Sequence, residues 1–243
     1  MKKSVFRLSL SLLCLLCALS LCTCALAADT SKANCTGRKL RHCDITELLS
    51  NRYTEGRPVI VFFPGSEECN SRQKAISFIR GYKLYDGLEV DLVSVTLHGE
   101  NVWYRDWESA VRDLFEFLKE KYDVSPFPVI ADAVSFGGYG GCYLAQYFTE
   151  NGIPVQELNL ADACGSYCIQ ADWIRRIAEA GTQVNLLACT GTSRMSRDTR
   201  AIIEAVEGTE NCASMLLECR HGEVLGVAIH ERGLHAAYAS EEE

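Results

Sequence analysis

The segment 128–148 constrains the fold of this chain more than any other stretch. Its first part predicts a buried strand, and its glycine-rich second part predicts a helix that begins just after Ser135. A strand that turns abruptly into a helix holds the residue at the turn, here Ser135, at the carboxyl edge of a sheet. The small residues Ala133, Gly137 and Gly138 leave room for the strand and the helix to approach closely. A serine held in this way has no evident packing purpose, so the segment indicates chemistry.

Strands and helices are predicted to alternate from residue 58 onward. The predicted strands cover 59–63, 90–97, the segment before Ser135, 155–160, 184–189, 215–219 and 224–229. The predicted helices cover 71–80, a segment that Asp106 caps, the segment from the Ser135 turn to about 150, 171–180 and 196–206. Such alternation indicates an α/β fold with a mainly parallel sheet and helices on both faces, which binds ligands at the carboxyl ends of its strands.

Residues 1–27 are predicted to be a signal peptide and no part of the fold. Three cations open a stretch whose apolar run covers 8–24, and Ala25-Leu26-Ala27 is a small-x-small cleavage site. The mature chain would therefore begin near Ala28 and be secreted. A lipoprotein anchored through Cys22 or Cys24 is the alternative, but the residues before these cysteines suit that processing poorly.

The rest of the chain has the size and charge of one acidic domain. Residues 28–57 form an N-terminal segment in this interpretation, and residues 58–243 form a domain with a large core. Once the three early cations are removed, 21 Lys and Arg face 32 Asp and Glu, a net charge of −11. That charge argues against nucleic acid or an anionic membrane surface as a partner. No further stretch approaches the ~20 apolar residues of a membrane span.

Nine cysteines remain after the signal peptide is removed. An exported chain with this many thiols is expected to carry disulfides, and the odd count leaves at least one cysteine unpaired. Cys35 with Cys43 and Cys164 with Cys168 are the candidate pairs, because each could close a short loop. Paired CxxC or HxxxH spacings are absent from the sequence, so we expect no metal site.

Three features fall at the carboxyl edge of the predicted sheet. The turn at 63–66 follows an early strand, and its backbone N–H groups, that of Ser66 included, can donate to a developing oxyanion. The N–H of Phe136, directly after Ser135, would be the second donor. The third feature is His235, which follows the last predicted strand close to the chain end.

In the order of these features the chain resembles the α/β-hydrolases, over about residues 58–238. That family has small-x-Ser-x-Gly after its fifth strand, an oxyanion turn after its third and a histidine after its eighth. The resemblance implies the α/β-hydrolase fold and catalysis without a cofactor. It matches Ser135 to the nucleophile, His235 to the general base, and the backbone of Ser66 and Phe136 to the oxyanion hole. His235 would take the Ser135 proton during attack on an acyl carbonyl and return it to the leaving group.

The sequence departs from the family pattern at the acid. The family has an Asp or Glu soon after its seventh strand, where this chain has Arg194. Asp198 follows a few residues later and can instead belong to the first turn of a helix, where the dipole favours a carboxylate. Asp162 ends the sixth strand, and some family members take their acid from there. We favour Asp162 over Asp198, and a site without a proper acid stays open.

Other residues near the predicted edge have two interpretations each. His221 lies in a predicted hairpin turn and is expected to be merely exposed. His98 ends a strand at the functional edge, where a substrate contact is conceivable. An aromatic cluster after that strand could form a pocket wall or simply pack against the next helix; it consists of Trp103, Tyr104 and Trp107.

The function predicted from these patterns is that of a secreted serine hydrolase. The substrate would be an ester of a small or polymer-attached acyl group. One alternative is a hydrolase-fold protein that has lost catalysis and binds a ligand. Another is a peptidase or acyltransferase that uses the same serine.

Overall fold

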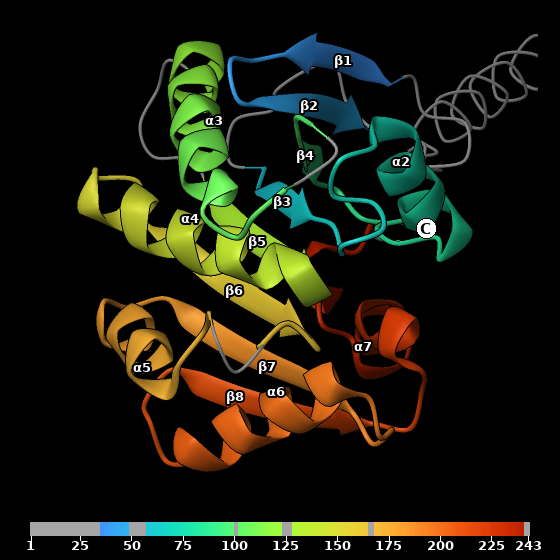
Figure 1. The fold of residues 1–243 in the computed structure, drawn as a ribbon, viewed down its shortest axis with the longest axis vertical. Helices are drawn as coiled ribbons and strands as arrows, with labels where there is room; N and C mark the ends of the chain where they lie inside the picture. Colours follow the sequence, from blue (N-terminus) through green and yellow to red (C-terminus); the bar gives the residue numbers. More distant parts are fainter. Residues whose placement is uncertain (1–34, 49–56, 100–101, 123–127, 165–167, 241–243) are drawn as a thin grey trace, which may run out of the picture.

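An eight-stranded sheet runs through the centre of the protein (Figure 1). The computed structural model describes residues 35–48, 57–99, 102–122, 128–164 and 168–240. The strands are β1 (Thr36–Lys39), β2 (Cys43–Leu48), β3 (Val59–Phe63), β4 (Asp91–Leu97), β5 (Val129–Val134), β6 (Val155–Ala161), β7 (Gln183–Cys189) and β8 (Cys212–Leu217). Their order across the sheet is β1-β2-β4-β3-β5-β6-β7-β8, and β3 to β8 are parallel. The predicted α/β fold with a mainly parallel sheet is thereby confirmed.

Helices cover both faces of the sheet, as Figure 1 shows. In the described part of the chain they are α2 (Arg72–Gly81), α3 (Asp106–Tyr122), α4 (Gly138–Glu150), α5 (Ala171–Glu179), α6 (Arg194–Ala205) and α7 (Val224–Arg232), with short 3-10 turns η1 (Ser135–Gly137), η2 (His221–Glu223) and η3 (Ala236–Tyr238). α3 to α6 pack on one face, and α2 and α7 pack on the other. Among these described helices, none combines the length and apolarity needed to cross a membrane.

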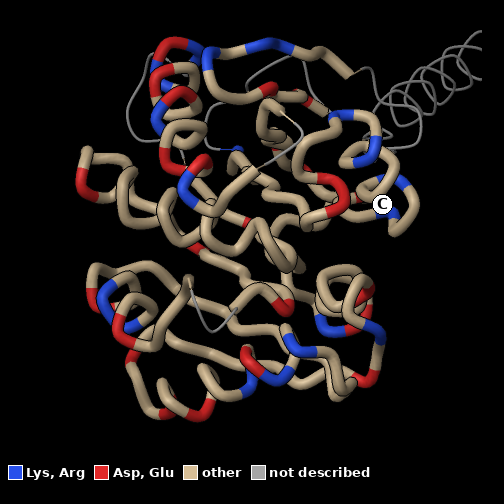
Figure 2. The backbone as a smooth tube through the Cα atoms, in the orientation of Figure 1, with Lys and Arg blue, Asp and Glu red and all other residues tan. Residues whose placement is uncertain are grey.

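Strand β3 shows why the predicted strands contain continuous apolar runs. All five of its residues are buried, and alternate side chains face opposite cores. Val59, Val61 and Phe63 belong to the core under α3 to α6, whereas Ile60 and Phe62 belong to the core under α2 and α7. Figure 2 shows that the central strands are largely uncharged, whereas the acidic and basic residues are interspersed along the outer helices and loops.

The N-terminal segment contributes two strands that the sequence analysis did not predict. β1 and β2 form an antiparallel hairpin, and β2 also pairs antiparallel with β4. The sheet therefore begins well before residue 58. All four residues of β1 are exposed, as is usual for a polar edge strand, so it carries no apolar signal from which it could be predicted.

The second predicted strand near the chain end is wrong. Residues 224–229 form most of helix α7, not a strand, and β8 ends at Leu217, before His221. The run is apolar throughout because this first part of α7 is almost wholly buried against the sheet, whereas its last three residues are exposed. Six apolar residues in a row do not distinguish a buried strand from a buried helix turn.

The two predicted disulfides are not present, since no two cysteines of the described residues are bonded to each other. The hairpin explains the outcome for one pair. Cys43 opens β2 beside the turn, whereas Cys35 precedes the far end of β1, where Thr36 pairs with Glu47. The two cysteines therefore lie at opposite ends of the hairpin.

A row of hydrogen-bonded polar side chains runs across three central strands of the sheet. Asp132, Asn159 and Asn185 occupy matching positions on β5, β6 and β7. Asn159 Nδ2 donates to Asp132 Oδ1 at 2.7 Å, and Asn185 Nδ2 donates to Asn159 Oδ1 at 2.7 Å. The other oxygen of Asp132 accepts from the Tyr85 hydroxyl at 2.8 Å and lies 2.8 Å from His235 Nε2. The segment after α7 is thus held to the centre of the sheet by a buried ion pair.

Burial and the neighbouring charge act in opposite directions on His235. Burial alone lowers the pKa of its imidazole, but the Asp132 carboxylate and, more weakly, Glu157 raise it, and the net pKa lies above the ordinary value of 6.5. His235 is therefore held as an imidazolium over a wider pH range than a free histidine.

Replacing His235 by Phe is expected to cost about 3 kcal/mol of unfolding free energy near pH 6, because it leaves the Asp132 carboxylate buried without its cation. Since the pKa of His235 is raised, its contribution is complete below the ordinary pKa and is lost as pH rises through the raised one. Urea denaturation between pH 6 and pH 9 should therefore show the difference between the two proteins shrinking. His98→Phe is the control, because the pair of His98 with Asp44 is partly exposed and worth below about 1 kcal/mol. Equal losses in the two variants would contradict this account.

Candidate active site

Ser135 occupies a strained turn at the carboxyl end of β5. Its φ is +51°. For any residue other than glycine this conformation is unfavourable in free energy, and it persists only where the surrounding packing enforces it. The residue is half-buried, and its hydroxyl makes no hydrogen bond to any described residue. The turn therefore presents a free hydroxyl at the edge where ligands bind in this kind of sheet.

Gly137 is the residue that allows this turn to pack. A Cβ placed on Gly137 would lie 2.3 Å from the carbonyl oxygen of Phe63 and 2.7 Å from that of Pro64, too close for any side chain. A Cβ on Gly65 would lie 3.6 Å from the Ser135 Cβ. The absence of a side chain at Gly137 thus brings the turn after β3 directly beside Ser135.

The two predicted oxyanion donors lie on these adjacent turns. Ser66 follows Gly65 in the turn after β3, and Phe136 is the second residue of η1. Neither backbone N–H has an acceptor among the described residues. Two free N–H groups next to a serine hydroxyl are what an oxyanion hole requires.

Asp162 leaves β6 at the same level at which Ser135 leaves β5, because Val134 pairs with Ala161 in the sheet. The φ of Asp162 is +45°, close to that of Ser135, so the backbone turns in the same way after β5 and after β6. Asp162 is fully buried. Its carboxylate accepts from the backbone N–H of Cys189 at 3.1 Å and from the Ser196 hydroxyl at 2.6 Å.

The third partner of Asp162 is His221, whose Nδ1 lies 3.0 Å from Oδ2. Burial alone raises the pKa of Asp162, but the hydrogen bonds from His221, Ser196 and Cys189 lower it, and the net pKa is below the ordinary value. The carboxylate is therefore ionised, and it orients the histidine through one ring nitrogen.

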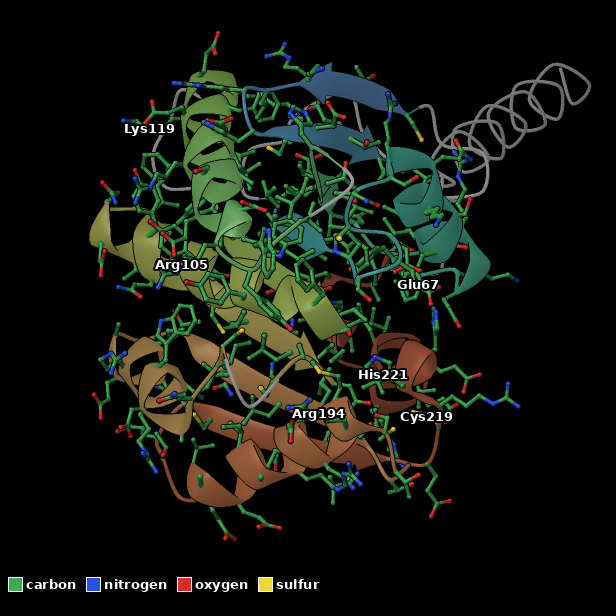
Figure 3. The ribbon with its side chains drawn as sticks, in the orientation of Figure 1. Glu67, Arg105, Lys119, Arg194, Cys219 and His221 are labelled. Atoms are coloured by element: carbon green, nitrogen blue, oxygen red, sulfur yellow. The ribbon has the colours of Figure 1, made fainter. Side chains whose placement is uncertain are left out.

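His221 has the exposure that a general base needs. It opens η2 directly after β8, and its loop is held by a hydrogen bond from the Arg220 N–H to Glu223 Oε2 at 3.0 Å. The side chain is 35% exposed. With Nδ1–H donating to Asp162, the other nitrogen, Nε2, carries a lone pair and has no partner among the described residues. Figure 3 shows His221 on the side of the molecule where α4 and α6 begin.

His235 does not occupy the position that the sequence analysis expected. Its Nε2 is bonded to Asp132, and its Nδ1 is buried without a partner, so neither nitrogen is accessible. We therefore withdraw the role of base from His235. The error came from counting residues 224–229 as the last strand, because a histidine directly after β8 is His221.

Of the two candidate acids, Asp162 is the one that the structure joins to a histidine. Asp198 lies within α6 and forms an ion pair with Arg194 at 3.6 Å. The structure therefore places Ser66, Ser135, Phe136 and Asp162 at one edge of the sheet, and His221, expected to be merely exposed, joins this edge through its hydrogen bond with Asp162.

The remaining candidates divide between core and surface. Trp107 is buried, so it is part of the core, whereas the Tyr104 ring lies 4.6 Å from that of Phe136 beside the serine. His98 is paired with Asp44 at 3.1 Å. Within the described ranges, no cluster of His, Cys, Asp and Glu could hold a metal ion.

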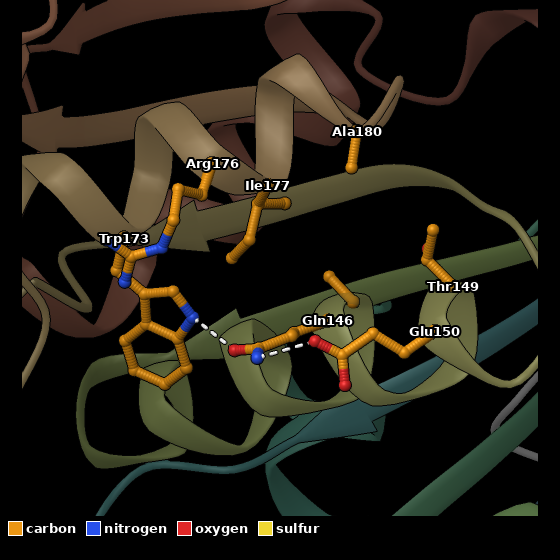
Figure 4. A pocket seen from close by; sticks show the side chains of 8 residues that line it. Gln146, Thr149, Glu150, Trp173, Arg176, Ile177 and Ala180 are labelled. Carbon is orange, nitrogen blue, oxygen red and sulfur yellow. Dashed lines mark hydrogen bonds between the residues drawn. The ribbon is translucent and has the colours of Figure 1, made fainter.

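A pocket between α4 and α5 is separate from this site (Figure 4). Trp173 Nε1 donates to Gln146 Oε1 at 2.9 Å on its wall, and Gln146 Nε2 donates to Glu150 Oε1 at 2.8 Å. Gln146 and Glu150 belong to the second half of α4, and Gln146 lies about 12 Å along the helix from its first residue, whereas Ser135 precedes that first residue.

No protein-family model matches the chain, and a comparison with curated proteins finds no match. Solved structures do match. An α/β serine hydrolase without a lid from Xanthomonas campestris has a TM-score of 0.57 and 11% identity, over 87% of this chain and 98% of that one. An ester hydrolase from the metagenome of Lake Arreo has a TM-score of 0.56 and 12% identity, over 86% of this chain and 80% of that one.

A dienelactone hydrolase from Anabaena variabilis is similar to the same extent, with a TM-score of 0.55 and 11% identity over 86% of this chain and 99% of that one. At these identities the similarity concerns the fold. Together with the strand order and the turn at Ser135, it shows that this protein has the α/β-hydrolase fold.

Proposed function

We propose that the protein is a serine hydrolase that cleaves esters, with Ser135 as nucleophile, His221 as general base and Asp162 as acid. The observation that carries the proposal is the buried Asp162 carboxylate bonded to a half-exposed histidine, at the edge where Ser135 is held in a strained turn. A nucleophile, a base and a group that orients the base are the three parts that such catalysis requires.

The reaction follows from these roles. His221 Nε2 accepts the Ser135 proton while the oxygen attacks the ester carbonyl, and the Asp162 carboxylate stabilises the imidazolium that forms. The N–H groups of Ser66 and Phe136 donate to the oxygen as it becomes negative. His221 then protonates the departing alcohol. Water repeats the sequence on the acyl-enzyme and releases the acid.

An ester is favoured over other acyl substrates by the neighbours in structure, which include a lidless serine hydrolase and an ester hydrolase bound to a phosphonate derivative. The net charge of −11 after removal of the leader disfavours nucleic acid as a partner. The binding-protein alternative depended on the missing acid after the seventh strand, and the hydrogen bond between Asp162 and His221 supports Asp162 in that role. The product separates hydrolysis from acyl transfer, since only hydrolysis releases the free acid when another acceptor is present.

We further propose that the protein is exported by the leader at residues 1–27. Expression of the full chain in a bacterium should give a secreted or periplasmic form whose N-terminal sequence starts near Ala28. A mature form that retains Met1, or one that begins with a lipid-modified cysteine, would contradict this proposal.

Replacing Ser135 by Ala should abolish labelling by a fluorophosphonate probe and reduce kcat/KM for p-nitrophenyl acetate by about 10⁴ to 10⁶-fold, because the nucleophile is lost. Gel fluorescence and initial rates measure the two effects. Folded wild-type protein that reacts with neither reagent would end the enzyme interpretation.

Replacing Asp162 by Asn should reduce kcat by about 10⁴-fold, because His221 would lose the group that holds its tautomer and stabilises its charge. His221→Ala should reduce kcat to a similar extent or further. Asp198→Asn and His98→Ala are the matched controls, each expected to stay within a few-fold of wild type. Circular dichroism should accompany the rates, because Asp162 is buried. A large loss in Asp198→Asn with activity retained in Asp162→Asn would reverse the assignment.

A further inference from the structure

The turn after β3 carries two adjacent acidic residues, Glu67 and Glu68, beside the proposed active site. Glu67 is exposed and Glu68 is half-buried. Figure 3 shows Glu67 on the same side of the molecule as His221. Nothing in the proposed mechanism uses either carboxylate, and a negative charge next to an oxyanion hole opposes the charge that develops there. The position of Glu68 therefore calls for a physical explanation.

Glu68 lies close to the nucleophile. A Cβ placed on Gly65 would lie 3.2 Å from Glu68 Oε2 and 3.6 Å from the Ser135 Cβ. Glu68 Oε2 and the Ser135 Cβ therefore lie around the same point next to Gly65. The distance between these two atoms is at most the sum of the two values. A substrate whose carbonyl carbon is attacked by Ser135 has its nearest substituents within reach of this carboxylate.

The backbone that carries Glu68 is firmly held. The N–H groups of Glu68 and Cys69 both donate to the carbonyl of Gly65, at 3.1 and 2.8 Å, and the carbonyl of Cys69 accepts from Leu97 N–H at 2.6 Å. The turn is thereby tied to the end of β4. The point from which the Glu68 side chain starts is therefore fixed by the same turn that presents the Ser66 N–H.

The charge of the Glu68 carboxylate is only partly compensated within the protein. Among the described residues, no other side chain forms a hydrogen bond or a close ion pair with it. Burial and, more weakly, the charge of Glu67 raise its pKa, whereas its own backbone N–H and the charge of Lys74 lower it by less, so the net pKa lies above the ordinary value. A half-buried carboxylate that is only partly compensated is stabilised further by a cation that arrives with a ligand.

We propose that Glu68 determines specificity and selects esters that carry an ammonium group within a few ångströms of the scissile carbonyl. This inference rests on the proposed function and names its substrate class. The bound cation neutralises Glu68 and so removes the charge that opposes the oxyanion. The Phe136 and Tyr104 rings, 4.6 Å apart beside Ser135, offer aromatic faces, which also attract ammonium groups. The net charge of −11 of the chain without its leader steers cationic substrates to the protein.

The test compares esters that differ only in charge. Acetylcholine and 3,3-dimethylbutyl acetate place the cation or its uncharged isostere on the alcohol, and the ethyl esters of betaine and of 3,3-dimethylbutyrate place it on the acyl group. The quantity measured is the ratio of kcat/KM for the cationic ester to that for its isostere, at low ionic strength. In Glu68→Gln this ratio is expected to fall about tenfold or more for at least one pair, because the local charge is removed. The neutral esters should react faster in the variant.

Glu67→Gln is the matched control. It removes one charge from the neighbouring, exposed position, where solvent screens the interaction, so the ratio should change less than threefold. A ratio that stays constant in Glu68→Gln for both pairs, or that falls equally in Glu67→Gln, would overturn the inference. Fluorophosphonate labelling of Ser135 in the same variants tests the proposed function separately.

Binding provides a readout without catalysis. Titration calorimetry with the Ser135→Ala protein should show a lower dissociation constant for acetylcholine or betaine ethyl ester than for the matching neutral ester. The added change Glu68→Gln should remove that preference. Equal affinities for the charged and neutral members of both pairs would refute the inference even if Ser135 is the nucleophile. A preference that depends on Glu68 would support it even if the hydrolysis rates are low.

Discussion

The close contact between η1 and the end of β3 is the constraint on which the candidate site depends. Gly137 packs against the carbonyl groups of Phe63 and Pro64 at a distance that no side chain permits. That contact holds Ser135 in its strained conformation and sets the turn after β3 beside it. The proposed nucleophile and both proposed oxyanion donors are therefore positioned by one packing interaction, between η1 and the end of β3. The cost of the strained turn is met by the burial of the strand and helix on either side.

A second point of convergence is Asp162, whose carboxylate accepts from β7, α6 and η2 through Cys189, Ser196 and His221. A buried carboxylate with this many donors stays ionised, as the lowered pKa of Asp162 shows. The same hydrogen bonds hold the start of α6 and the loop after β8 at the edge where Ser135 emerges. Asp162 thus positions the ends of β7, α6 and η2 at this edge as well as orienting His221.

Two aspartate–histidine pairs occur in this molecule, and they differ in what surrounds them. His235 and Asp132, the latter on the central strand β5, are both fully buried, and their ion pair holds the C-terminal segment in place. His221 and Asp162 lie at the edge, and the histidine is partly exposed. Exposure of the second ring nitrogen decides which pair can transfer a proton to and from a substrate. That property depends on what packs over each histidine, and it has no counterpart in the local sequence of either one.

The sequence by itself determined the succession of strands and helices from residue 58 to the end of α6, because apolar runs and helical spacing are local properties of the chain. It also indicated the strand-to-helix turn at Ser135 and the neighbouring turn after β3, since glycine spacing at such turns is equally local. Asp162 was named from the sequence, but only together with Asp198. The tertiary structure joined Asp162, and not Asp198, to a histidine, buried His235 against Asp132, and added β1 and β2 to the sheet. Each of these outcomes depends on contacts between segments far apart in the chain: α7 is a helix because it is buried on the sheet, and the base is recognised only when the loop after β8 meets the end of β6.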